Sequence, residues 1–64
     1  MKILSGYTPD GKHFDLTLID NQLYIVTDEE STLYNEEYYE EDEIFGSSAL
    51  ASVKASLISD GYRL

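Results

Sequence analysis

The residues of this 64-residue chain that are best suited to chemistry are carboxylates, and most of them lie in one stretch. Nine acidic residues fall within positions 28–43, with no lysine, arginine or histidine among them. They are Asp28, Glu29, Glu30, Glu36, Glu37, Glu40, Glu41, Asp42 and Glu43. The other positions hold four acids and four bases, so the formal net charge of −9 resides in this stretch. Nucleic acids and anionic membranes repel such a charge, whereas basic protein surfaces attract it.

Tyrosines are interleaved with these carboxylates at Tyr34, Tyr38 and Tyr39. Carboxylates one helical turn apart have Cβ atoms about 5–6 Å apart, and alternate strand residues lie about 6.6 Å apart. Both spacings resemble that of phosphates along a nucleic-acid strand. The pattern therefore predicts phosphate stand-ins for a Lys/Arg groove, with the tyrosines as contact anchors that stack on arginine. The alternative is a solvated acidic face, which suits a small protein equally well.

Catalytic and metal-binding motifs are missing from the sequence. His13 is the one conventional base near neutral pH, and its neighbour Asp15 on the same strand face is expected to be a solvated partner. No glycine-rich phosphate loop, nucleophile elbow or thiol is present. The acidic runs lack the spacing of a calcium loop. One histidine without cysteine excludes a thiolate site and a multi-histidine zinc site within one chain. We therefore expect a non-enzymatic protein with no cofactor and no dedicated metal site.

Residues 1–27 predict a three-stranded β-meander, because apolar and polar side chains alternate between turn signals. Asp20 and Asn21 both tolerate the left-handed region of backbone space and predict a two-residue turn. This turn pairs Leu18 with Leu23 and places the apolar residues of both strands on one face.

The first hairpin admits two registers. A two-residue turn at positions 10–11 places Tyr7 on the core face, and packing favours it. A three-residue turn at positions 9–11 with a glycine bulge shifts the pairing by one residue, so that Leu4 and Gly6 face the core. Turn chemistry favours this second register. We predict the first register.

The acidic, tyrosine-rich segment at residues 28–46 admits three interpretations. A helix gathers Tyr34, Tyr38 and Phe45 on one stripe, whereas a strand interrupts its aromatic face with glutamates. A loop with a helical turn followed by a short strand at residues 43–45 is the third. Glutamate favours the helix and tyrosine the strand, so the order of this segment before binding stays open.

Residues 47–61 predict a helix capped by Ser47 or Ser48 and stopped by Gly61. Its apolar stripe is Leu50, Val53 and Leu57. The tail after Gly61 is expected to fold back on the sheet. The chain is thus predicted to be one α+β domain, with a three- to four-stranded antiparallel sheet and one C-terminal helix packed on one face. A core this small also makes a homodimer an expectation.

The small size, the high negative charge and the acidic-tyrosine run from Tyr34 to Phe45 resemble a class of bacteriophage proteins. These are small acidic inhibitors of host nucleic-acid enzymes, such as anti-CRISPR proteins and uracil-DNA glycosylase inhibitors. The resemblance is compositional and covers under a fifth of the chain. It implies a decoy that occludes a basic DNA- or RNA-binding groove of a phage-defence nuclease complex.

Partner and location follow from the same features. We expect a basic protein partner, no direct nucleic-acid binding and no membrane association, because no apolar run reaches the roughly 20 residues of a membrane helix. We expect a cytoplasmic location. The rival hypothesis is an ordinary interaction module or accessory subunit. Its contact surface would be a sheet edge or the strand face around Thr17, Tyr24 and Val26, and its acids would only be solvated.

Overall fold

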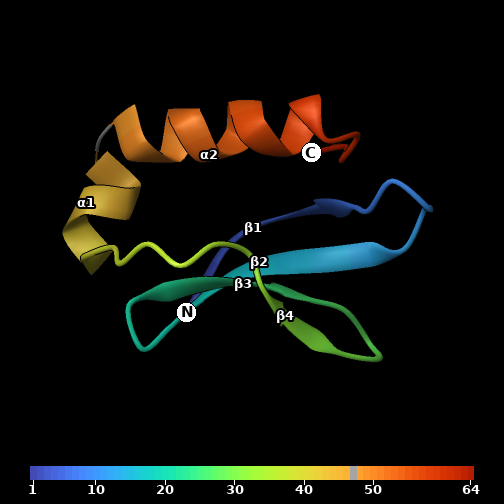
Figure 1. Cartoon of the computed structure of the whole chain (residues 1–64), viewed down its shortest axis with the longest axis horizontal. Helices are drawn as coiled ribbons and strands as arrows, with labels where there is room; N and C mark the ends of the chain where they lie inside the picture. Colours follow the sequence, from blue (N-terminus) through green and yellow to red (C-terminus); the bar gives the residue numbers. More distant parts are fainter. Residues whose placement is uncertain (47) are drawn as a thin grey trace.

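Four antiparallel strands followed by two helices make up the residues described by the computed structural model, 1–46 and 48–64. The elements are β1 (Lys2–Tyr7), β2 (His13–Ile19), β3 (Gln22–Val26), β4 (Ser31–Leu33), α1 (Glu41–Gly46) and α2 (Ser48–Ser59). The strands form one sheet in the order β1-β2-β3-β4. Figure 1 shows α2 running along one side of this sheet, with α1 beyond one end of the strands. The predicted α+β fold is confirmed, and β4 is its fourth strand.

The core lies between the helices and one face of the sheet. Strict alternation along β2 and β3 buries every second side chain, as expected of a sheet covered on one side. The buried apolar side chains are Phe14, Leu16, Leu18, Leu23, Ile25, Ile44, Val53 and Leu57. Burying each of them stabilises the fold by about 1.5–3 kcal/mol relative to exposure.

The first hairpin has the second of the two registers, so the predicted register is wrong. Gly6 lies opposite Phe14 and faces the core, whereas Tyr7 lies opposite His13 and is exposed. The N–H of Gly11 donates to the carbonyl oxygen of Thr8 at 2.9 Å, and Gly11 has a φ of +88°. Local turn chemistry therefore determined the pairing, because only glycine adopts this backbone conformation without strain.

The second hairpin follows its prediction. Leu18 pairs with Leu23 across a two-residue turn. Asp20 and Asn21 have φ values of 51° and 65°. Positive φ at both positions is the signature of a type I′ turn, whose twist matches that of the flanking strands.

The acidic segment combines elements that the sequence alone did not separate. Its first part contributes β4, residues 34–40 have no regular secondary structure, and α1 follows. A single helix or a single strand through residues 28–46 is therefore wrong, and so is a strand at residues 43–45.

Charge position explains why a helix forms at the end of this segment. Glu41, Asp42 and Glu43 occupy the first turn of α1, where the positive end of the helix dipole stabilises carboxylates. Ile44 then enters the core, and Phe45 remains exposed. The acids of this helix thus have a local structural role as well as a charge.

The C-terminal helix ends as predicted. Gly61 has a φ of +97°, its N–H donates to Ile58 at 3.0 Å, and the N–H of Tyr62 donates to Leu57 at 3.0 Å. These two bonds form a Schellman motif, which satisfies the last carbonyl groups of α2. Ser48 is the first residue of α2, and the alternative cap Ser47 lies outside the described residues.

The tail after α2 folds back on the sheet. Tyr7 donates its N–H to the carbonyl oxygen of Arg63 at 2.7 Å and accepts the Arg63 N–H at 2.9 Å. The ring of Tyr62 meets Phe14 edge to face, with centroids 5.2 Å apart. A Cβ atom added to Gly6 would lie 2.2 Å from the Arg63 carbonyl oxygen, so the tail can approach the sheet only over a glycine.

Candidate functional site

The nine predicted acidic site residues lie on the surface in two separate groups. The turn group, between β3 and β4, is Asp28, Glu29 and Glu30. The segment group, which runs into α1, is Glu36, Glu37, Glu40, Glu41, Asp42 and Glu43. Figure 1 shows the β3–β4 turn and α1 toward opposite ends of the molecule. All nine residues are exposed, but they do not form one continuous row.

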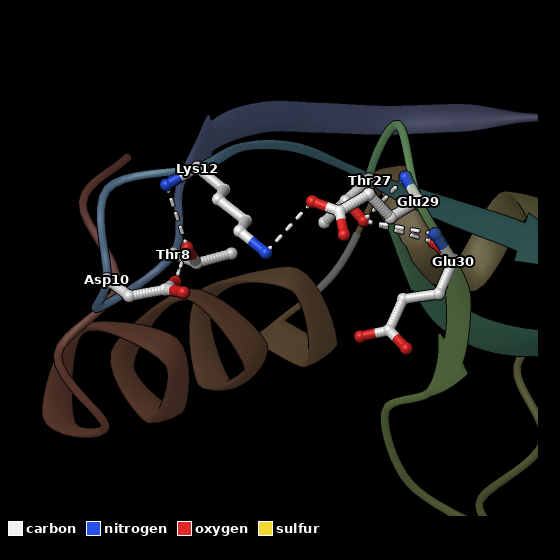
Figure 2. Close-up of polar contacts among 6 residues, drawn as sticks. All are labelled: Thr8, Asp10, Lys12, Thr27, Glu29 and Glu30. Carbon is white, nitrogen blue, oxygen red and sulfur yellow. Dashed lines mark hydrogen bonds and ion pairs between the residues drawn. The ribbon is translucent and has the colours of Figure 1, made fainter.

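Hydrogen bonds and an ion pair hold the turn group in place. The hydroxyl oxygen of Thr27 accepts the N–H groups of Glu29 and Glu30 at 3.3 and 3.2 Å. The Nζ of Lys12 lies 3.0 Å from Oε1 of Glu29 and links this turn to the β1–β2 loop (Figure 2). The hydrogen bond to Glu29 raises the pKa of the Lys12 ammonium. Hydrogen bonds from the backbone to Thr27 thus define this turn, and the Lys12 ammonium compensates part of its charge.

A groove of about 450 Å³ lies beside the turn group. The side chains that give it its chemical character are Asp10, Lys12, Glu30, Tyr34, Asp60 and Tyr62. Three carboxylates outnumber one ammonium group, so the groove favours cations over anions. His13 is not among its lining residues, and the groove holds no histidine base for nucleophilic catalysis.

The loop that borders this groove contains a titratable contact. The Thr8 hydroxyl donates to the Asp10 carboxylate and accepts the N–H of Lys12 at 3.0 Å (Figure 2). The hydrogen bond from Thr8 lowers the pKa of the Asp10 carboxyl below 3.8. A depressed folded-state pKa contributes stability above the unfolded value, and this contribution is lost as the pH falls through the folded value.

We expect Thr8→Val to raise the pKa of Asp10 toward 3.8, because valine removes the hydroxyl donor. The variant should also be less stable than the native chain above the unfolded pKa of Asp10, and this difference should disappear as the pH falls through the folded value. An NMR titration of the Asp10 carboxyl carbon in both proteins measures the shift. Equal midpoints in the two proteins would contradict this assignment.

Tyr34 and Tyr39 hold the stretch of chain that carries the segment group against the sheet and α2. The hydroxyl of Tyr34 donates to Oγ of Ser56 on α2 at 2.8 Å, and the N–H of Tyr34 donates to the carbonyl of Leu23 at 2.8 Å. The side-chain amide of Asn21 donates to the carbonyl oxygen of Tyr39 at 2.9 Å, and the N–H of Tyr39 donates to the carbonyl oxygen of Asn21 at 2.8 Å. Residues 34–40 thus have defined anchors without regular secondary structure.

The three predicted contact anchors therefore differ in role. Tyr34 and Tyr39 pack against the core, whereas the side chain of Tyr38 is 75% exposed. The Tyr39 hydroxyl donates to the carboxylate of Glu37 at 2.9 Å and accepts the Asn35 side chain at 3.1 Å. Partial burial raises the pKa of Tyr39; the Asn35 bond opposes this rise and the Glu37 bond supports it. Tyr39 stays protonated at neutral pH and orients the Glu37 carboxylate, while Tyr38 is available to a partner.

Two residues outside the predicted site, Asn21 and Ser56, fix the position of this segment. The sequence predicts Asn21 as a turn residue, but this prediction does not indicate that its side chain also forms a hydrogen bond with Tyr39. Ser56 has no distinguishing sequence feature, since serines are frequent in α2. These residues were missed because their partners are distant in the sequence.

Other chemistry-bearing residues lie outside both groups. The His13 ring packs edge to face on Tyr7, with centroids 5.7 Å apart, and the Asp15 carboxylate accepts the Ser5 hydroxyl at 2.6 Å. Within residues 1–46 and 48–64, no set of three or more His, Cys, Asp or Glu residues is placed to hold a metal ion. None of the helices in these ranges has the length and apolar character needed to cross a membrane.

No protein-family model, curated protein or solved structure matches this chain. The features of the chain that bear on its function are therefore the charge, exposure and anchoring of the two acidic groups.

Proposed function

We propose that this chain is a non-enzymatic inhibitor that presents its segment group to the basic, nucleic-acid-binding groove of another protein. The observation that carries this proposal is the anchoring of the segment. Six exposed acidic residues lie on a stretch of chain that Tyr34 and Tyr39 tie to the sheet and to α2. A surface ordered before binding loses little conformational entropy in the complex, which favours its use as a rigid decoy.

Electrostatics supports the same proposal. The ion pair between Lys12 and Glu29 lies in the turn group, away from the segment group. A dense, exposed negative surface attracts a basic groove over several ångströms and accelerates association at low ionic strength. Added salt screens this attraction, so the complex should weaken as salt rises.

Tyr38 adds an aromatic contact to the charge attraction between the segment group and its partner. Its exposed ring lies between Glu37 and Glu40 in the sequence, where it can stack on an arginine that the neighbouring carboxylates attract. The turn group forms a second, smaller acidic patch that adds long-range attraction. The resemblance to small acidic phage inhibitors favours a phage-defence nuclease complex in the bacterial cytoplasm as the target.

The test is a charge-neutral variant of the segment group. In this variant Asp42 is replaced by asparagine and the five glutamates by glutamine. These glutamates are Glu36, Glu37, Glu40, Glu41 and Glu43. We expect the native chain to retain a nucleic-acid-binding protein from bacterial lysate, and added DNA or RNA to displace it. The variant should bind this protein at least about tenfold more weakly, because the neutral amides lose the charge attraction. Mass spectrometry identifies the partner, and circular dichroism verifies that the variant is folded.

The control neutralises the turn group instead, with Asp28→Asn, Glu29→Gln and Glu30→Gln. We expect a smaller loss of binding than with the segment-group variant. Equal retention of the partner by the native chain and the segment-group variant would overturn the decoy mechanism. It would favour the rival function, an interaction module that binds through its sheet and carries the acids only as a solvated face.

A further inference from the structure

The sheet has a second face that no helix covers, here called the outer face. Its central row is formed by Thr17, Tyr24 and Leu33, which pair across β2, β3 and β4. Ile19 and Val26 occupy outer-face positions of the neighbouring rows. In Figure 1 α2 runs along the opposite side of the sheet, and α1 lies beyond one end of the strands. Leu33 and Ile19 are exposed, while Tyr24 and Val26 are half-buried by their neighbours alone.

The outer face differs in charge from the two acidic groups. Of the thirteen acids of the chain, Asp15 is the one at a paired outer-face position, and Lys2, paired with Thr17, provides the opposite charge. The formal charge of this face is therefore balanced on a molecule of net charge −9. A second copy of the chain therefore meets less charge repulsion at this face than at the segment group.

We infer that a second copy of this chain packs on the outer face, sheet against sheet. A two-fold interface must be complementary to itself, and a face with one lysine, one aspartate and an apolar centre meets this requirement. The size of the chain supports the same occupant. Domains of about 60 residues bury only about 60% of their unfolded surface, and self-association is a common supplement to so small a core.

The area of the face sets the strength of this association. Four strands about 4.8 Å apart and about five residues long present roughly 300 Å² per copy, against about 800 Å² per partner in a stable complex. The dimer therefore forms at high protein concentration and dissociates on dilution. Because each copy carries −9 elsewhere, salt strengthens this dimer. The proposed decoy complex has the opposite salt dependence, so the two inferences fail independently.

The experiment measures the mass of the native chain by sedimentation from micromolar to millimolar concentration, at low and high salt. Tyr24→Lys places a charge at the centre of the outer face. Its matched control is Ile58→Lys, which changes the charge equally on the side of α2 that faces solvent, where Ile58 is 60% exposed. We expect the native chain and Ile58→Lys to dimerise alike, and Tyr24→Lys to raise the dissociation constant at least about tenfold, as for a central interface residue.

Concentration-dependent amide shifts of the native chain, measured by NMR, provide a second readout that needs no variant. Shifts confined to β2, β3 and β4 are expected. A monomer at millimolar protein and high salt would overturn the inference, as would shifts centred on α2 or on the segment group. Equal dimerisation of folded Tyr24→Lys and the native chain would overturn it as well.

Discussion

Replacing Gly6 with alanine should destabilise the protein by about 2–4 kcal/mol, through overpacking and the loss of backbone hydrogen bonds. The added methyl group would lie 2.2 Å from the carbonyl oxygen of Arg63 and 3.1 Å from Cα of Leu64. Both neighbours are backbone atoms, so no side chain can rotate to make room. The tail must leave the sheet, and both bonds between Tyr7 and Arg63 are lost with it. For a domain of this size, whose total stability is about 3–10 kcal/mol, the loss is a large fraction.

Urea denaturation of the native chain and Gly6→Ala measures this effect. Gly46→Ala is the matched control, because nothing lies within 4 Å of a Cβ added at Gly46 and its φ is not in the left-handed region. That substitution should be neutral or stabilise the helix by up to about 1 kcal/mol. Unchanged stability in Gly6→Ala, with the Arg63 amide still protected from hydrogen exchange, would refute the packing of the tail.

Ile44→Ala should cost about 2–5 kcal/mol, the range of large-to-small substitutions in a core. Ile44 is completely buried and is the one buried residue of α1. Its removal leaves a cavity and detaches the helix that carries Glu41, Asp42 and Glu43. The variant retains every carboxylate but loses part of the anchoring of the segment group. It therefore tests whether partner binding depends on the position of these carboxylates as well as on their charge.

Phe45→Ala is the control for this change, since Phe45 is the adjacent residue and its side chain is 52% exposed. Its stability should remain within about 1 kcal/mol of the native value, as for surface substitutions. Equal losses in the two variants, measured by thermal or chemical unfolding, would show that α1 is not anchored through Ile44. If the decoy mechanism holds, Ile44→Ala should also weaken partner binding while Phe45→Ala leaves it intact.

The elements that the sequence predicted well are those determined by neighbours along the chain. The hairpin at Asp20 and Asn21 depends on two adjacent residues with positive φ, and the end of α2 depends on Gly61. The predicted register of the first hairpin is wrong because its glycine turn, and not the packing of Tyr7, determines the strand pairing. The turn at Gly11 sets the register that places Gly6 on the core face. No local pattern, however, indicates that Arg63, far along the chain, packs over Gly6.

In the candidate site, too, the sequence predicts some features, and others depend on contacts between distant parts of the chain. Composition alone identifies the nine acids, and the structure places all of them on the surface. Their separation into two groups could not be predicted, because it depends on β4 and on the path of residues 34–40. The same holds for the tyrosines. Tyr34 and Tyr39 find partners on α2 and in the second hairpin, and only the three-dimensional arrangement distinguishes them from Tyr38.

The short strand β4 has a consequence for aggregation. It forms one edge of the sheet with only three residues, Ser31–Leu33, and an open strand edge is a template for fibril growth. Acidic residues lie close to both of its ends, with Glu30 before it and Glu36 after it. Pairing of β4 with the sheet edge of another copy would bring these carboxylates close to a second molecule of net charge −9, and the mutual repulsion opposes growth. We therefore expect the acidic stretch to act as a gatekeeper against extension of the sheet through β4 into a fibril.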